Sequence, residues 1–167
     1  AGCSTTSSAV AVVVNALPAV TIASNGPTTF CQGGSVTLTS STGTSYAWSN
    51  GATTASITVN TSGNYSVTVT NANGCSATSA SVPVTVNTLP IANITSLNGN
   101  TFCQGGSVTL VSSAGSSYAW SNGLTTQSIN VTASANLTVT VTNANGCSAT
   151  SAPFGVTMNA SPVATIT

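Results

Sequence analysis

Cysteine is the most reactive residue type in this chain, and its five copies follow a fixed spacing. Cys3, Cys75 and Cys147 form one series and Cys31 and Cys103 a second, each with a step of 72 residues. The chain has no His and no CxxC pair, so the spacing does not fit a zinc site. It has no basic side chain to activate a thiol for redox catalysis. We therefore predict disulfide formation in an oxidising compartment.

Two pairings of these cysteines fit the spacing. Within each complete repeat, Cys31 would pair with Cys75 and Cys103 with Cys147, 44 residues apart in both cases, which leaves Cys3 unpaired. A loop of that length would stabilise a small module by about 4 kcal/mol in the chain-entropy model. However, Cys31 is expected after the first strand and Cys75 at the last hairpin, at the opposite pole. The alternative is therefore a bridge across the repeat boundary, from Cys31 of one repeat to Cys147 of the next.

Charged residues are absent from the 167-residue chain, which contains no Lys, Arg, Asp, Glu or His. An ordinary soluble domain carries about a quarter charged residues. Their absence excludes acid–base catalysis by those side chains, phosphate binding by basic groups and calcium or magnesium sites built on carboxylates. We therefore expect a protein that is not an enzyme, with no catalytic residue, no cofactor, no metal and no nucleic-acid partner.

The apolar residues are spread in short runs. They make up 41% of the chain, and the longest run, 9–14, has six residues. A membrane span needs about 18, so no membrane span is expected. The chain has no initiator Met and no signal-peptide pattern, and we expect it to be part of something longer.

The spacing of the cysteines extends to whole segments. The segment 67–80 recurs without change as 139–152, again 72 residues later. Such a period is the signature of a tandem array. The expected organisation is the C-terminal strand of a preceding repeat, two complete repeats and the start of a following repeat, at residues 1–17, 18–89, 90–161 and 162–167 respectively.

Each repeat has the pattern of short strands separated by turns. Val36, Leu38 and Ser40 alternate with threonines, as in a half-buried strand, and the Asn50-Gly51 pair is a turn signal. Threonine, valine and serine disfavour helix. About six or seven strands per repeat predict an all-β fold, a tandem of small immunoglobulin-like β-sandwiches.

Two tryptophans recur at matching positions of the repeats. Trp48 follows Tyr46 and Ala47, and Trp120 follows Tyr118 and Ala119. A sandwich buries a large ring at such a position, so we predict that Trp48, Trp120, Tyr46 and Tyr118 belong to the core. The alternative is an exposed aromatic platform for carbohydrate.

Several motifs of the repeat also resemble a known family. WSNGATT (48–54) and GNYSVTVTNANGC (63–75) are similar to the SprB-type and immunoglobulin-like repeats of very large Bacteroidota surface adhesins. This resemblance implies a secreted, cell-surface protein exported by the type IX system, often with a role in gliding motility or attachment. Family members commonly carry Asp in the turn where this chain has Asn71 and Asn143, which removes any calcium role.

These observations predict a structural, non-catalytic segment, a stalk or filament, of an extracellular bacterial adhesin or surface filament. The alternative is a glycan- or surface-binding module that uses aromatic, Asn and Thr side chains, and ice binding by Thr-rich faces is ranked below it. Without charges to block association of strand edges, the expected partners are neighbouring copies of the chain in a filament or array, with surface glycans as the alternative partner.

Overall fold

The computed structural model describes residues 1–163 and contains β-strands only in that range. The chain divides into two compact units, Ala1–Val86 and Asn87–Thr167. The first unit therefore ends at Val86, three residues earlier than residue 89, where the first complete repeat was expected to end. Residues 1–17 form no strand, so their assignment to a preceding repeat stays a prediction. Of the expected start of a following repeat, residues 164–167 lie outside the described residues.

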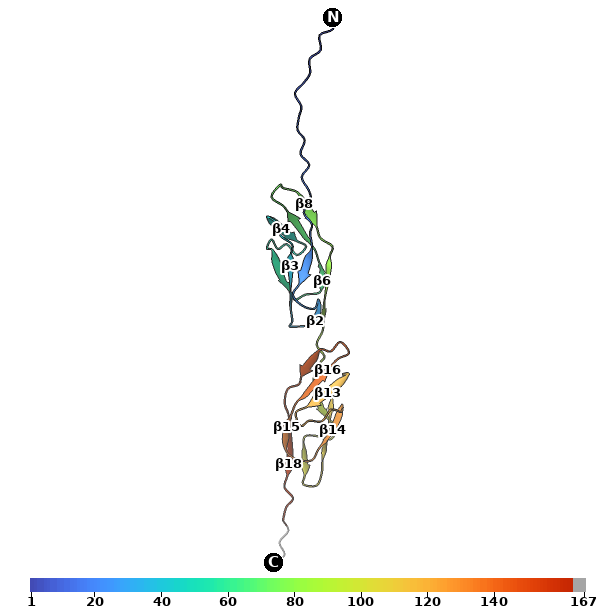
Figure 1. Ribbon diagram of the computed structural model, residues 1–167. Helices are drawn as coiled ribbons and strands as arrows, with labels where there is room; N and C mark the ends of the chain where they lie inside the picture. The colour runs from blue at the N-terminus through green and yellow to red at the C-terminus, as the bar shows by residue number, and fades with distance from the viewer. Residues whose placement is uncertain (164–167) are drawn as a thin grey trace, which may run out of the picture. The chain divides into compact units, whose positions relative to one another are not determined.

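The two units repeat the same series of strands (Figure 1), and each strand of the second unit begins 72 residues after its counterpart. The strands of the first unit are β1 (Ile22–Ser24), β2 (Thr29–Cys31), β3 (Val36–Ser40), β4 (Ser45–Trp48), β5 (Ser56–Val59), β6 (Gly63–Tyr65), β7 (Val67–Thr70), β8 (Ser76–Thr78) and β9 (Val82–Asn87). Those of the second are β10 (Ile94–Ser96), β11 (Thr101–Cys103), β12 (Val108–Ser112), β13 (Ser117–Trp120), β14 (Ser128–Val131), β15 (Ala135–Leu137), β16 (Val139–Thr142), β17 (Ser148–Thr150) and β18 (Phe154–Asn159).

Each unit contains three small sheets. In the first unit the strand orders are β1-β3-β5, β4-β7-β8 and β2-β9-β6. β6 and β7 are separated only by Ser66, so one stretch of chain supplies a strand to each of two sheets. In the second unit β11 runs parallel to β18, and the other strand pairs are antiparallel.

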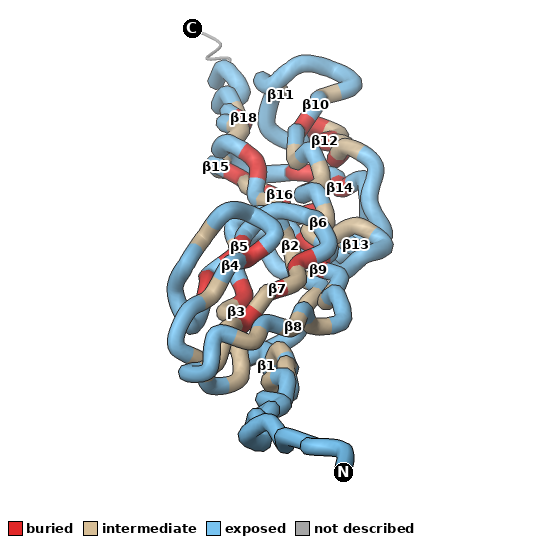
Figure 2. Tube along the Cα trace, turned by 90° about the horizontal axis from the view of Figure 1, so that it is seen from above, coloured by how far each residue is buried: buried red, intermediate tan, exposed pale blue. Residues whose placement is uncertain are grey.

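The core of each unit lies between these sheets because alternate residues of a strand face opposite sides. In β3, Val36 and Leu38 are buried, whereas Thr39 is exposed. Buried positions are concentrated on the strands, and the turns are exposed (Figure 2). The first core comprises Val36, Leu38, Trp48, Ile57, Val59, Tyr65, Val67, Val69 and Val84. The second comprises Ile94, Val108, Leu110, Trp120, Ile129, Val131, Leu137, Val139, Val141 and Val156.

Hydroxyl groups pair between β7 and β8 on the face of this hairpin that is turned away from the core. Thr68 Oγ1 lies 2.8 Å from Thr78 Oγ1, and Thr70 Oγ1 lies 2.8 Å from Ser76 Oγ. Such cross-strand pairs stabilise a hairpin. The face turned away from the core is therefore polar without carrying any charge.

A close approach between backbone and core fixes the turn before β4. The Gly43 N–H donates to the Tyr46 hydroxyl at 3.0 Å, and that hydroxyl donates to the Gly43 carbonyl at 3.2 Å. A Cβ atom at Gly43 would overlap Val69 Cγ1, which belongs to the core. Only glycine fits between this turn and β7.

These features make the chain all-β, with each unit a small immunoglobulin-like β-sandwich, as the sequence predicts. Within residues 1–163, no helix is long and apolar enough to cross a membrane.

Candidate functional site

The turn after β16 holds the linker that leads into the second unit. The Asn143 side chain donates from Nδ2 to the Thr88 carbonyl at 2.9 Å. Its Oδ1 accepts hydrogen bonds from the backbone N–H groups of Asn145 and Cys147, each at 3.0 Å. A single side chain therefore closes its own turn and fastens the linker to the unit that the linker enters.

The same arrangement occurs in the first unit. Asn71 Nδ2 donates to the Ala16 carbonyl at 2.9 Å, and Asn71 Oδ1 accepts from the N–H groups of Asn73 and Cys75 at 3.0 Å. In both units the amide nitrogen of the asparagine donates to the linker carbonyl, and the amide oxygen accepts from the turn. A carboxylate has no donor at neutral pH, so Asp could close the turn but could not hold the linker.

This role of Asn71 and Asn143 was not predicted from the sequence, where the two residues served only to exclude calcium binding. The sequence held one hint of this role, because the family that the chain resembles commonly carries Asp at these two positions. Asn in place of Asp adds a hydrogen-bond donor. The carbonyl that accepts from this donor lies 55 residues away, and nothing in the sequence identifies that carbonyl.

The two cysteines of the second unit lie at opposite ends of that unit. Cys147 follows the turn after Thr142, beside the linker contact, and we call this the leading end. From Thr142, β16 and β15 lead away from this end to Ala135, seven residues earlier in the chain. Ala135 pairs with Val156 of β18, and three residues further along β18, Asn159 pairs with Cys103. About ten residue steps of about 3.3 Å place the two cysteines roughly 30 Å apart. We call the end with Cys103 the trailing end.

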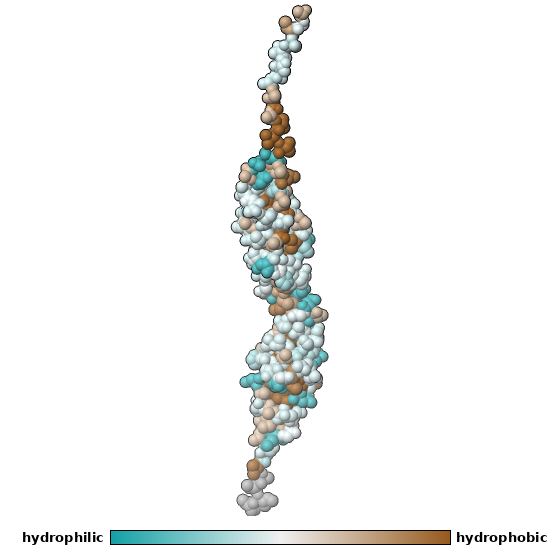
Figure 3. Space-filling model, viewed as in Figure 1, coloured by the Kyte–Doolittle hydropathy of each residue, from teal (hydrophilic) through white to brown (hydrophobic). Residues whose placement is uncertain are grey.

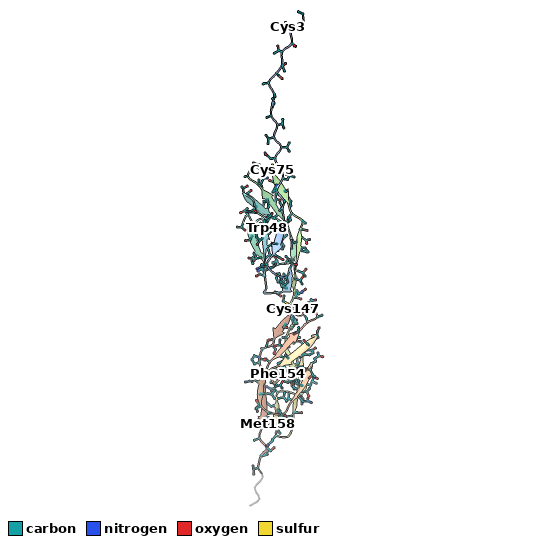
Figure 4. All side chains as sticks on the ribbon, viewed as in Figure 1. Cys3, Trp48, Cys75, Cys147, Phe154 and Met158 are labelled. Atoms are coloured by element: carbon teal, nitrogen blue, oxygen red, sulfur yellow. The ribbon has the colours of Figure 1, made fainter. Side chains whose placement is uncertain are left out.

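The figures show the same separation inside each unit. In the second unit, Cys147 is at one end and Met158, which pairs with the residue before Cys103, is at the other (Figure 4). In the first unit, β8 lies toward the end that residues 1–17 approach, and β2 lies toward the opposite end (Figure 1). Cys75 Sγ lies 3.9 Å from the Asn15 carbonyl, at the leading end.

The expected pairing within each repeat is therefore wrong. A disulfide requires Cα atoms less than about 7 Å apart, and the ends of one unit are several times that distance apart. Cys31 and Cys147 are disulfide-bonded, whereas Cys3, Cys75 and Cys103 carry free thiols. Neither Cys31–Cys75 nor Cys103–Cys147 is formed. Cys147 is fully buried, Cys75 is half-buried and Cys103 is exposed.

The tryptophans lie in the two cores. Trp48 and Trp120 are each 4% exposed. Trp48 Nε1 donates to the Thr54 carbonyl and Trp120 Nε1 to the Thr126 carbonyl, both at 2.8 Å. Neither ring presents a face on which a sugar could stack, which argues against the carbohydrate platform.

The tyrosines that precede them take a different position. Tyr46 and Tyr118 are only half-buried and pack against the edge of their cores. Their hydroxyl groups bond the glycine turns at Gly43 and Gly115. Tyr65 is more deeply buried, at 7% exposed, although the sequence did not predict it as a core residue.

The most hydrophobic exposed stretch lies in the N-terminal segment, before β1 (Figure 3). Its exposed large side chains are Val10, Val12, Val13, Val14 and Leu17. No pocket is formed within residues 1–163, and in that range no three His, Cys, Asp or Glu side chains lie close enough together to hold a metal ion.

Comparison with known proteins gives structural similarity only. No protein-family model matches the chain, and no curated protein matches it significantly. The chain is similar to murine CEACAM1b at 13% identity, over 84% of this chain and 100% of that chain, with a TM-score of 0.40. It is similar to fibronectin(III)-like modules of Clostridium thermocellum CbhA at 12% identity, over 83% and 93% of the chains, with a TM-score of 0.42.

A third similar structure is that of a 1.5-MDa bacterial ice-binding adhesin, at 20% identity, over 85% of this chain and 66% of that chain, with a TM-score of 0.38. All three TM-scores are below 0.5, so these similarities carry no argument about function.

Proposed function

We propose that this chain is a structural repeat segment, part of a stalk or filament, of an extracellular bacterial adhesin or surface filament. The observation that carries the proposal is the linker contact at the leading end of each unit. Asn71 and Asn143 hold carbonyl groups at the same sequence separation, so the fastening is a constant feature of the repeat. A hydrogen bond that fastens the incoming linker to each of the two units is a feature expected of a spacer.

The chemistry of the side chains supports a role without catalysis. The chain has no Lys, Arg, Asp, Glu or His, and both tryptophans are buried in the cores. The remaining polar side chains are hydroxyls and amides, which serve cross-strand pairs and turns in both units. These groups build a stable module, and the hydroxyls of Ser and Thr and the amides of Asn and Gln do not serve as general acids or bases near neutral pH.

The cysteines support a location outside the cell. Cys31 and Cys147 are disulfide-bonded, and such bonds persist in oxidising compartments and on cell surfaces. The similarity of 48–54 and 63–75 to Bacteroidota surface repeats points to the same location and to an adhesin as the parent protein.

Labelling of intact cells tests this proposal. An antibody raised against the chain should stain unpermeabilised cells of the source organism as strongly as permeabilised ones. A matched antibody against a cytoplasmic protein should stain only after permeabilisation. Staining by the first antibody that also requires permeabilisation would refute an extracellular role.

We also propose that neighbouring copies associate side by side through their uncharged faces. The hydroxyl-bearing face of β7 and β8 carries no charge, and β8 is the edge strand of its sheet. Because edge strands without charges favour association, sedimentation at high protein concentration should detect assemblies of equal size in low and high salt. A chain that stays monomeric in both salts would contradict lateral packing.

A further inference from the structure

The free thiols of the two units lie at positions whose counterparts are disulfide-bonded. A shift of 72 residues converts Cys75 to Cys147 and Cys31 to Cys103. Cys147 and Cys31 are disulfide-bonded, whereas Cys75 and Cys103 are free. Each position of the repeat therefore supports a disulfide in one copy and carries an open thiol in the other.

We propose that Cys75 and Cys103 are covalent attachment points, through which this chain forms disulfides with a further repeat at each end. Cys75 would bond a trailing-end cysteine of a preceding repeat, and Cys103 would bond a leading-end cysteine of a following repeat. The proposal deepens the proposed function, because it depends on the chain being part of an array.

The position of each thiol determines its partner. Cys103 is exposed at the trailing end, where it pairs with the last residue of β18. Cys75 is at the leading end, where its Sγ contacts the Asn15 carbonyl of the incoming segment. Two cysteines of one repeat are too far apart to pair. In a head-to-tail array, each trailing end is followed by the leading end of the next repeat, so a bond must join cysteines of opposite type.

The surroundings of Cys75 favour this use. The Asn71 side chain closes the turn around the Cys75 N–H and holds the Ala16 carbonyl. The turn and the incoming segment are therefore fixed beside the thiol before it reacts. Prior ordering of this kind lowers the entropic cost of forming a bond.

The bond forms by thiol–disulfide exchange with a small disulfide such as oxidised glutathione. The Cys103 thiolate attacks one glutathione sulfur, which gives a mixed disulfide and releases one reduced glutathione. The Cys75 thiolate of another copy then attacks the Cys103 sulfur and releases the second. The two protein thiols lose two protons and two electrons, which reduce one glutathione disulfide to two thiols.

Two variants of the full 167-residue chain separate the two ends. Both carry Cys3→Ser, which removes the exposed thiol of the N-terminal segment. One also carries Cys75→Ser and keeps only the trailing-end thiol. The other also carries Cys103→Ser and keeps only the leading-end thiol. Each is incubated with oxidised glutathione at high concentration, alone and mixed in equal amounts, and analysed on non-reducing gels.

The mixture should give a covalent heterodimer in at least about fivefold excess over the homodimer of either variant alone. That ratio corresponds to a difference of about 1 kcal/mol in the free energy of dimer formation. Chymotryptic mapping should find the Cys75 peptide joined to the Cys103 peptide. Homodimers that form as readily as the heterodimer, or a mixture that stays monomeric with glutathione-capped thiols, would overturn the proposal. Cell-surface staining would be unchanged by that result, so the proposed function is tested separately.

Discussion

Replacing Gly43 by Ala tests whether the turn before β4 is packed as tightly as the structure shows. The new methyl group would overlap Val69 Cγ1 and lie 3.0 Å from the Thr70 carbonyl oxygen. Val69 is fully buried, so neither group can move into open space. Inserting one carbon into a packed core costs about 1–3 kcal/mol.

The displaced turn would also strain the two hydrogen bonds between Gly43 and the Tyr46 hydroxyl, each worth about 1 kcal/mol. We therefore expect Gly43→Ala to destabilise the first unit by about 2–4 kcal/mol. For a unit of this size, that corresponds to a fall in Tm of roughly 10–25 °C. Differential scanning calorimetry should show the transition of the first unit moving to lower temperature.

Gly63→Ala provides the matched control in the same unit. Its methyl group would meet the Tyr65 ring at 3.5 Å, an ordinary contact, and the second repeat already has Ala135 at the equivalent position. This change should alter the stability by no more than about 0.5 kcal/mol. If Gly43→Ala has as small an effect as Gly63→Ala, the tight packing of the turn is refuted.

Three further predictions follow from the sites described above. Trp120→Phe leaves the Thr126 carbonyl without its indole donor and opens a cavity, so urea denaturation should show a loss of about 2–3 kcal/mol. Asn143→Asp keeps the turn but loses the donor to the Thr88 carbonyl, so amide hydrogen exchange of the linker should become faster, with about 1–2 kcal/mol lost; unchanged exchange would contradict the fastening. Because no Asp, Glu or His is present, the folded and unfolded states bind equal numbers of side-chain protons between about pH 5 and 7, and Tm should stay constant there.

The strand pattern and the main core could be predicted from the sequence. Val36 and Leu38 alternate with threonines, and a period of two places them on one face. The burial of Trp48 follows from its place in a short strand. The all-β sandwich is confirmed because these signals are local and recur in both repeats.

The contacts between distant segments could not be predicted. The parallel pairing of β11 with β18 joins residues more than 50 positions apart, and no local pattern encodes it. Pairing within each repeat was expected from the spacing of Cys103 and Cys147 and is wrong, although the expected strand order already placed the two cysteines of a repeat at opposite poles, as the structure does. The role of Asn143 depends on a carbonyl of the linker 55 residues away and was missed because no local pattern encodes it.

The linker contact also determines where an array can be cut. A fragment that begins at Pro90, as the sequence period would recommend, lacks the carbonyl of Thr88 and leaves the Asn143 amide without its partner. A fragment that begins at Asn87 retains it. A protein engineer who wishes to express one module, or to splice modules into a longer rod, should therefore carry the preceding three residues with every copy.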